Sequence, residues 1–133
     1  MPVTDSHRRV ALVIARARVG AGAAMLLAGR PLVRLAVGRD GAAAGAAMRL
    51  TGGRDLALGV GTLTCLHERT QDAEWVSMGA LVDGIDAVVL LVTPKLPVRA
   101  RLLGVVAAAT AAAGLMAGRR LADERDAAVP DSA

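Results

Sequence analysis

The chain alternates long apolar stretches with short polar or proline-containing segments, and four of the stretches are long enough to cross a bilayer. We place the spans at about residues 10–29, 44–66, 75–92 and 101–118. The last stretch is the clearest, because residues 102–118 carry no charge and are bounded by Arg101 and Arg119. The pattern predicts an all-α protein, built as a four-span transmembrane helical bundle.

The segments between these spans are short and contain glycine, proline or charged residues: 38–41, 67–74 and 93–97. Short connections favour antiparallel neighbours, so we expect one up-and-down domain over residues 1–133. Arg30-Pro31 is expected to end the first span, since a residue before proline disfavours the helical conformation. Residues 32–37 should then form a short amphipathic turn, and residues 119–133 a mobile tail.

Composition supports the membrane interpretation. Hydrophobic residues make up 54% of the 133 residues and the mean hydropathy is +0.48, whereas soluble domains run at about 45–50% apolar. The alternative is a soluble helical bundle with an alanine-rich interior. The expected location is the cell membrane, with several passes through it. The bilayer is the expected partner, and a second copy of the chain or another membrane protein is a further candidate.

The net charge of +4 does not indicate nucleic-acid binding. The arginines flank apolar stretches, and the chain has no Phe or Tyr on which a base could stack. Contact with lipid phosphates explains them better, so no nucleic-acid partner is expected. Six basic residues outside the spans fall on each side, so the positive-inside rule assigns no orientation.

Five charged residues lie within the apolar spans, away from their ends: Arg18, Arg54, Asp55, Asp83 and Asp86. In the third span, nine apolar residues favour insertion by about 3–5 kcal/mol in total, and each aspartate opposes it by about 2.5–3.5 kcal/mol. The two contributions nearly cancel. This helix therefore needs a partner or a proton to neutralise its carboxylates.

The spacing of these charges indicates how they should pair. Asp83 and Asp86 are three residues apart and share one helical face. Arg54 and Asp55 are adjacent and point about 100° apart, so we expect them not to neutralise each other. Arg18 supplies a second cation. The cluster is expected to be either a structural staple that sets helix order, or a site for a proton, cation or small polar ligand.

Glycines at helical spacing are expected to let neighbouring helices approach closely: Gly22, Gly52, Gly59, Gly79, Gly114 and Gly118. Residues 114–118 form a small-x-x-x-small pattern. Packing within the chain is the first interpretation of this pattern, and self-association through the uncharged last span is the alternative.

No catalytic or metal-binding pattern is present in the sequence. His67-Glu68 lacks the second histidine of a zinc-protease helix, and His7 is the only other histidine. The glycines form no phosphate-binding loop. Cys65 is alone, so it forms no internal disulfide. We therefore expect no catalytic residue, no metal site and no cofactor, and the chain is not expected to be an enzyme.

Residues 53–59 (GRDLALG), followed by residues 83–86 (DGID), resemble a family of small bacterial four-helix membrane proteins known only as a domain of unknown function. That family is distantly similar to the DoxX-like membrane proteins. The resemblance covers about residues 16–118. It implies a four-span membrane protein and carries no reaction, cofactor or partner. DoxX-like proteins are associated with redox enzymes, but no residue here matches that role.

Three functional hypotheses follow from the sequence. The first is a non-enzymatic structural or accessory membrane component. The second is a small transporter or a proton or cation relay that uses Asp83 and Asp86. The third is an accessory subunit of a membrane redox enzyme.

The ionic cluster has two arginines and three aspartates, so a fully ionised cluster has one surplus negative charge. Because arginine stays protonated, we predict that one aspartate is protonated or that a cation is bound. Infrared carboxyl bands of the purified protein, recorded without added cations, measure this directly. Three ionised aspartates in that preparation would contradict the prediction.

Overall fold

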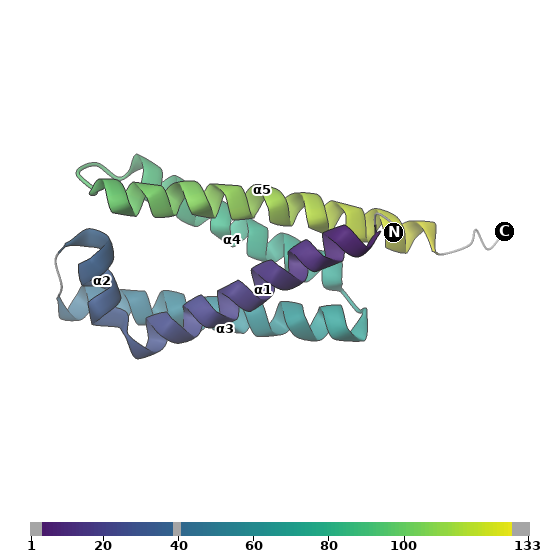
Figure 1. Ribbon diagram of the computed structural model, residues 1–133, viewed down its shortest axis with the longest axis horizontal. Helices are drawn as coiled ribbons and strands as arrows, with labels where there is room; N and C mark the ends of the chain where they lie inside the picture. Colours follow the sequence, from purple (N-terminus) through teal and green to yellow (C-terminus); the bar gives the residue numbers. More distant parts are fainter. Residues whose placement is uncertain (1–3, 39–40, 129–133) are drawn as a thin grey trace.

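The computed structural model describes residues 4–38 and 41–128, and within these ranges the chain is entirely helical apart from short connections. Five helices pack as a bundle (Figure 1). In chain order they are α1 (Thr4–Leu27), α2 (Gly29–Val37), α3 (Ala42–Glu68), α4 (Asp72–Val92) and α5 (Val98–Ala127). The all-α prediction is confirmed for this part of the chain.

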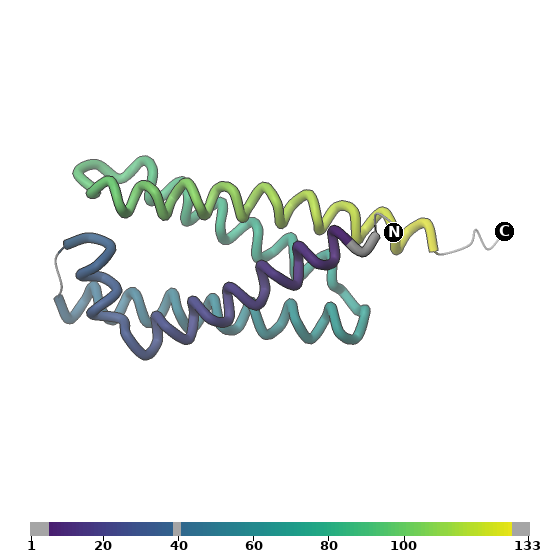
Figure 2. Tube along the Cα trace, viewed as in Figure 1, coloured from purple at the N-terminus to yellow at the C-terminus, as the bar shows by residue number. Residues whose placement is uncertain are grey.

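The four long helices form two antiparallel pairs. Helix α1 packs chiefly against α3, and α4 packs chiefly against α5. The short helix α2 lies across the end of the bundle where α4 turns into α5 (Figure 1). The start of α1 and the end of α5 lie together at the opposite end (Figure 2). This is the up-and-down order expected from the short connections.

The break after α1 lies earlier than the sequence suggested. The chain leaves the helical conformation at Ala28, whose φ is −118° and ψ 35°. Arg30 and Pro31 then belong to α2, so the prediction that they end the first helix was wrong. Proline is tolerated in the first turn of a helix, where its missing N–H would have had no intrahelical acceptor.

The amphipathic turn expected at residues 32–37 is part of a nine-residue helix. It ends at Gly38, whose φ of 81° is left-handed and whose N–H donates to the Arg34 carbonyl. A glycine in this conformation avoids the clash that a Cβ would make, so the sequence stops α2 at this residue.

The mobile tail predicted from residue 119 was wrong for residues 119–127, because α5 continues to Ala127. Leu121 is 6% exposed and packs in a small core with Ala11, Leu66 and Ala117. Leu121 thus packs the extra helical turns against the bundle, and an ion pair between Arg125 and Glu74 of α4 also ties them to it. Residues 129–133 lie outside the described residues.

Within the described residues, three helices are long and apolar enough to cross a membrane: α1 from Ser6, α4 and α5. Helix α3 has 27 residues, which extend about 40 Å and exceed the bilayer core of about 30 Å. It is not among these three helices, because Arg49, Arg54 and Asp55 leave it no equally apolar continuous stretch. Its crossing of the membrane stays a prediction.

Small residues fill the interior of the bundle and large apolar residues cover its outside. The largest wholly buried side chain is Leu66, and most of the buried apolar residues are alanines. Exposed large residues run along the outer faces of α4 and α5: Leu81, Ile85, Val88, Val89, Leu102, Leu103, Val105, Val106 and Met116. A soluble bundle buries such residues, so this arrangement favours hydrocarbon as the surrounding solvent.

Glycines allow the paired helices to touch backbone to backbone. A Cβ on Gly52 would lie 2.7 Å from the Gly22 carbonyl oxygen, and a Cβ on Gly59 3.0 Å from the Ala15 carbonyl oxygen. Gly114 contacts Ala80 across the α4–α5 pair in the same way, and Gly118 contacts the backbone of that helix. The packing within the chain that was expected for residues 114–118 is therefore present.

We predict that Gly22→Ala lowers the free energy of unfolding by about 1–3 kcal/mol, the usual range for an overpacked interior. The new Cβ would lie 2.6 Å from the Leu56 amide nitrogen and 2.7 Å from the Gly52 carbonyl oxygen, both rigid backbone atoms. Gly20→Ala in the same helix is the matched control, since nothing lies within 4 Å of its Cβ. Thermal unfolding in detergent measures both, and equal stability of the two variants would contradict the packing account.

Candidate functional site

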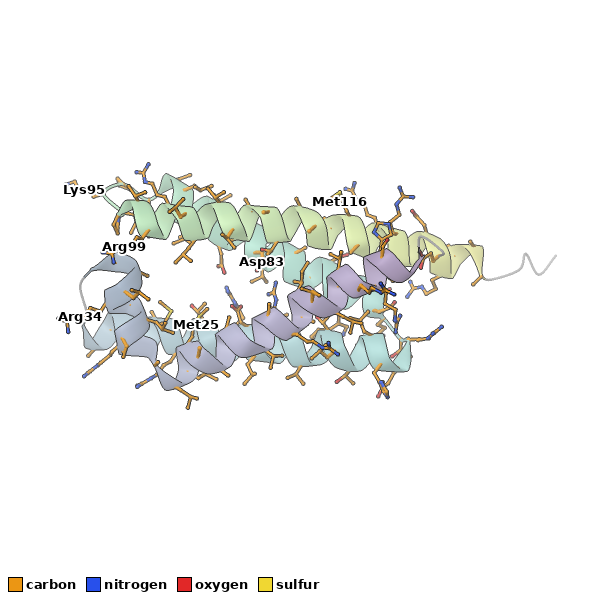
Figure 3. The ribbon with its side chains drawn as sticks, in the orientation of Figure 1. Met25, Arg34, Asp83, Lys95, Arg99 and Met116 are labelled. Atoms are coloured by element: carbon orange, nitrogen blue, oxygen red, sulfur yellow. The ribbon has the colours of Figure 1, made fainter. Side chains whose placement is uncertain are left out.

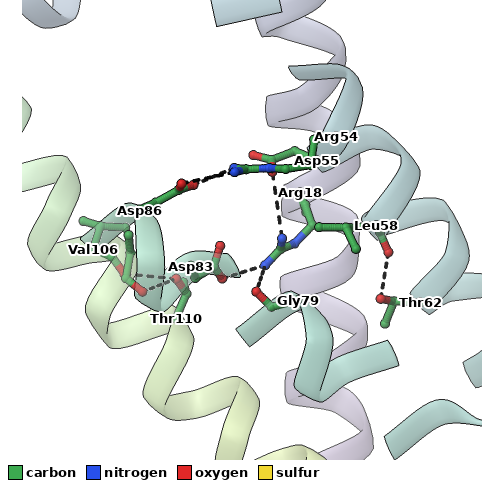
Figure 4. Close-up of polar contacts among 11 residues, drawn as sticks. Arg18, Arg54, Asp55, Leu58, Thr62, Gly79, Asp83, Asp86, Val106 and Thr110 are labelled. Atoms are coloured by element: carbon green, nitrogen blue, oxygen red, sulfur yellow. Dashed lines mark hydrogen bonds and ion pairs between the residues drawn. The ribbon is translucent and has the colours of Figure 1, made fainter. Parts of the chain in front are cut away.

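The five intramembrane charges predicted from the sequence meet in one place, away from the ends of the helices (Figure 4). Arg18 comes from α1, Arg54 and Asp55 come from α3, and Asp83 and Asp86 come from α4. The structure therefore brings together all five residues of this cluster, which we call the ion network.

Arg18 forms the buried half of the ion network. Its Nη2 donates to Asp83 Oδ2 at 2.6 Å and to the Gly79 carbonyl oxygen at 3.0 Å. Its Nη1 lies 3.9 Å from Asp55 Oδ1. The Arg18 side chain is 7% exposed, so these partners take the place of water around its charge.

Gly79 was expected only as a packing residue, and its environment explains why glycine is suited to this position. A Cβ there would lie 3.3 Å from Arg18 Nη2. The bare backbone lets the guanidinium come close enough to hydrogen-bond the carbonyl oxygen.

Arg54 forms the more open half of the ion network. Its two terminal nitrogens donate to the two oxygens of Asp86, Nη1 at 3.1 Å and Nη2 at 2.5 Å. This forked geometry is the strong arrangement for an arginine and a carboxylate. The Arg54 and Asp86 side chains are 36% and 33% exposed, so the pair reaches the surface where α3 meets α4.

The expectation that Arg54 and Asp55 would not pair was wrong. Arg54 Nε and Nη2 both donate to Asp55 Oδ1, at 3.2 and 3.1 Å. The two Cβ atoms do diverge around the helix, but the arginine side chain is long enough to fold its guanidinium back over its neighbour. Asp55 consequently lies between the two arginines and links the halves of the network.

Both strong ion pairs connect one helical pair to the other. Arg18–Asp83 joins α1 to α4, and Arg54–Asp86 joins α3 to α4. Helix α4 packs much more extensively on α5 than on α3. The ion pairs therefore join the two helical pairs in addition to the apolar core, to which all four long helices contribute.

A small cavity of about 10 Å³ adjoins the buried half of the network. Arg18, Asp83, Thr62 and Thr110 contribute its polar lining, and Gly79 and Gly114 are among its other lining residues. Space of this size admits about one water molecule. Arg18 Nη1 is buried beside it without a hydrogen-bond partner among the described residues, so a water there would complete its hydrogen bonding.

Sequence analysis missed the two threonines beside this cavity. Their hydroxyls donate to their own helices, Thr62 to the Leu58 carbonyl oxygen at 2.8 Å and Thr110 to the Ala107 carbonyl oxygen at 2.9 Å. Thr110 was detectable, because it is the only hydroxyl in the uncharged stretch of residues 102–118. Its proximity to Asp83 depends on how α5 is rotated, which one sequence does not reveal.

Two further ion pairs close the end of the bundle that holds the start of α1 and the end of α5. Arg8 Nη1 lies 3.4 Å from Asp72 Oδ2, and Arg125 Nη2 lies 2.8 Å from Glu74 Oε1. Arg8 also donates to the Leu66 carbonyl oxygen. In the part of the chain that the structure describes, no group of three His, Cys, Asp or Glu side chains is placed to hold a metal ion.

No protein-family model, curated protein or solved structure matches this chain. The resemblance to the four-helix family of unknown function therefore stays a prediction, and the residues themselves carry the functional argument.

We predict that Asp83→Asn lowers the free energy of unfolding by about 3–5 kcal/mol, because it leaves the buried Arg18 charge without its closest partner. Arg18→Gln should cost a similar amount, and the double variant much less than the sum, since it removes both charges. The free energies of unfolding of the wild type and the three variants, measured in detergent, give the coupling energy between Arg18 and Asp83. Arg125→Gln is the matched control from an exposed ion pair, and its effect should be smaller. Additive effects of Arg18→Gln and Asp83→Asn would contradict a direct interaction.

Proposed function

We propose that this protein is an integral membrane protein with four transmembrane helices, α1, α3, α4 and α5, and that it acts as a non-enzymatic structural or accessory component. The observation that carries the proposal is the inverted distribution of side chains. Large apolar residues cover the outside, whereas the interior holds glycine, alanine and paired charges. Such a chain is stable in hydrocarbon, where apolar side chains need no burial and charges must find one another.

The geometry of α3 supports counting it as a fourth span. Its charges Arg54 and Asp55 are engaged by partners within the bundle, and its glycines pack against α1. Ion pairing thus offsets the cost of removing Arg54 and Asp55 from water. The aspartates Asp83 and Asp86 of α4 need the same compensation. A helix paired in this way can lie in a membrane although its own composition is only moderately apolar.

The accessory role is supported by the exposed part of the ion network. Arg54 and Asp86 are about one third exposed, at mid-helix, on the seam between α3 and α4. Lipid tails offer no hydrogen bonds to this pair. A second protein surface on the seam, from another copy or a different membrane protein, would complete its environment.

A proton or cation relay is the second candidate, and the cavity beside Asp83 favours it. The network has one more carboxylate than it has arginines, and the cavity has room for about one water. Arg18 Nη1, which has no hydrogen-bond partner among the described residues, belongs to a residue that lines this cavity. A protonated aspartate and a water are the elements of a relay, although the cavity is too small for a larger solute. No described residue favours the redox-subunit hypothesis over these two.

Expression of the wild type, Asp83→Asn and Asp86→Asn tests the proposal. The wild type should stay in membranes washed with alkaline carbonate and dissolve only in detergent. If the network is structural, each variant should give several-fold less monodisperse protein, because an arginine is left without its main partner. Asp123→Asn is the matched control, since Asp123 is exposed beyond the apolar part of α5.

Proton flux into liposomes containing each purified variant separates the two candidates. If the wild type conducts protons and the aspartate variants are obtained in normal yield without this flux, the relay would be favoured. The structural proposal would then be wrong. Release of the wild type by carbonate would overturn the membrane assignment itself.

A further inference from the structure

At the end of the bundle where α2 lies, an open hollow is bounded by three arginines. Arg30 and Arg34 come from α2 and Arg99 from the start of α5, and with Pro31 and Leu35 they line a volume of about 580 Å³. Figure 3 shows Arg34 and Arg99 at this end of the bundle. All three arginine side chains are exposed. The hollow is therefore an open surface lined by three positively charged side chains.

No described residue supplies an acidic counterpart to these charges. Among the described residues of the segments 27–53 and 87–117 there are six basic residues and no acidic one. None of Arg30, Arg34 and Arg99 forms an ion pair with a described residue. At the opposite end of the bundle, by contrast, Asp72 and Glu74 pair with arginines. No described acidic residue therefore competes with an external anion for the three arginines.

An apolar groove continues from the hollow toward the middle of the bundle. It has a volume of about 300 Å³ and shares Leu35 and Arg99 with the hollow. Apart from Arg99 it is lined by apolar side chains from four helices: Met25, Leu32, Leu35, Ala36, Met48 and Leu103. Figure 3 shows Met25 deeper along the bundle than Arg34 and Arg99. A ligand that fills both spaces must be anionic at one end and apolar along its length.

We propose that the hollow and the groove together bind one anionic phospholipid, with its phosphate between Arg30, Arg34 and Arg99 and one acyl chain in the groove. This inference rests on the proposed membrane location. Helix α2 lies across the bundle end (Figure 1), so in a membrane its arginines would stand at the level of the lipid head groups. Met25, which lines the groove, lies deeper along the bundle, where the acyl chains would be (Figure 3). Arginine suits this role because its planar fork binds phosphate oxygens in pairs.

A second groove in the same protein provides an internal contrast. It has a volume of about 450 Å³ and is lined by apolar residues of α1 and α5, but its only charged residue is Arg9. A surface of this kind can accept a lipid tail without selecting the head group. The cluster of three arginines therefore makes the α2 site selective.

Native mass spectrometry of detergent-purified protein, titrated with phosphatidylglycerol or phosphatidylcholine, tests the site. We expect at least about tenfold higher occupancy by phosphatidylglycerol, since each basic residue contributes appreciably to anionic-lipid binding. The variant Arg30→Gln/Arg34→Gln/Arg99→Gln should bind both lipids equally. The variant Arg69→Gln/Arg119→Gln/Arg120→Gln loses the same charge from exposed positions at the other end and should keep the preference.

Equal binding of the two lipids by the wild type would overturn the inference, as would an equal loss of preference in both triple variants. Ala36→Trp fills the groove while leaving all three arginines in the chain, and it should weaken phosphatidylglycerol binding. Complete displacement of the lipid by glycerol phosphate would identify an anion site without a lipid tail and would also overturn it. Each of these results is independent of the carbonate extraction, which tests membrane location separately.

Discussion

Charged side chains that must satisfy one another away from water are the constraint on which the rest of this structure depends. Arg18 is almost fully buried, and its contacts with Asp83 and the Gly79 carbonyl oxygen replace the water that it loses. Arg54 neutralises the charge of Asp86 and donates two parallel hydrogen bonds to its carboxylate. Because each pair joins a helix of the α1–α3 pair to α4, the charges fix how the two halves of the bundle face each other. An apolar contact would leave this register freer, since it is less directional.

Small residues make these ion pairs geometrically feasible. Gly22 and Gly52 bring α1 against α3, and Gly114 brings α5 against α4. Gly79 then leaves room for the Arg18 guanidinium at the junction of the two pairs. Close approach of backbones thus builds the two helical pairs, and Gly79 lets the Arg18 guanidinium come close to the backbone of α4 where the pairs meet.

The two ends of the bundle differ in how their charges are used. At the end that holds the start of α1 and the end of α5, arginines pair with Asp72 and Glu74 within the chain. At the α2 end, Arg30, Arg34 and Arg99 surround an open hollow and have no described acidic partner. The first arrangement closes the bundle on itself, whereas the second leaves positive charge for an external anion. The positive-inside rule, which counts basic residues alone, does not detect this difference.

The sequence by itself determined the helical class, the connections and the charges that must meet. The segment 93–97 separates α4 from α5 as its two prolines indicate, and aspartates in an apolar helix need arginines for energetic reasons alone. Only the tertiary structure decided which charges pair, because this depends on side-chain reach and helix rotation. Arg54 folds back onto Asp55, Thr110 turns toward the cavity at Asp83, and Leu121 holds α5 in place beyond residue 119. Each of these depends on contacts between residues distant in the chain, and a one-dimensional pattern does not specify such contacts.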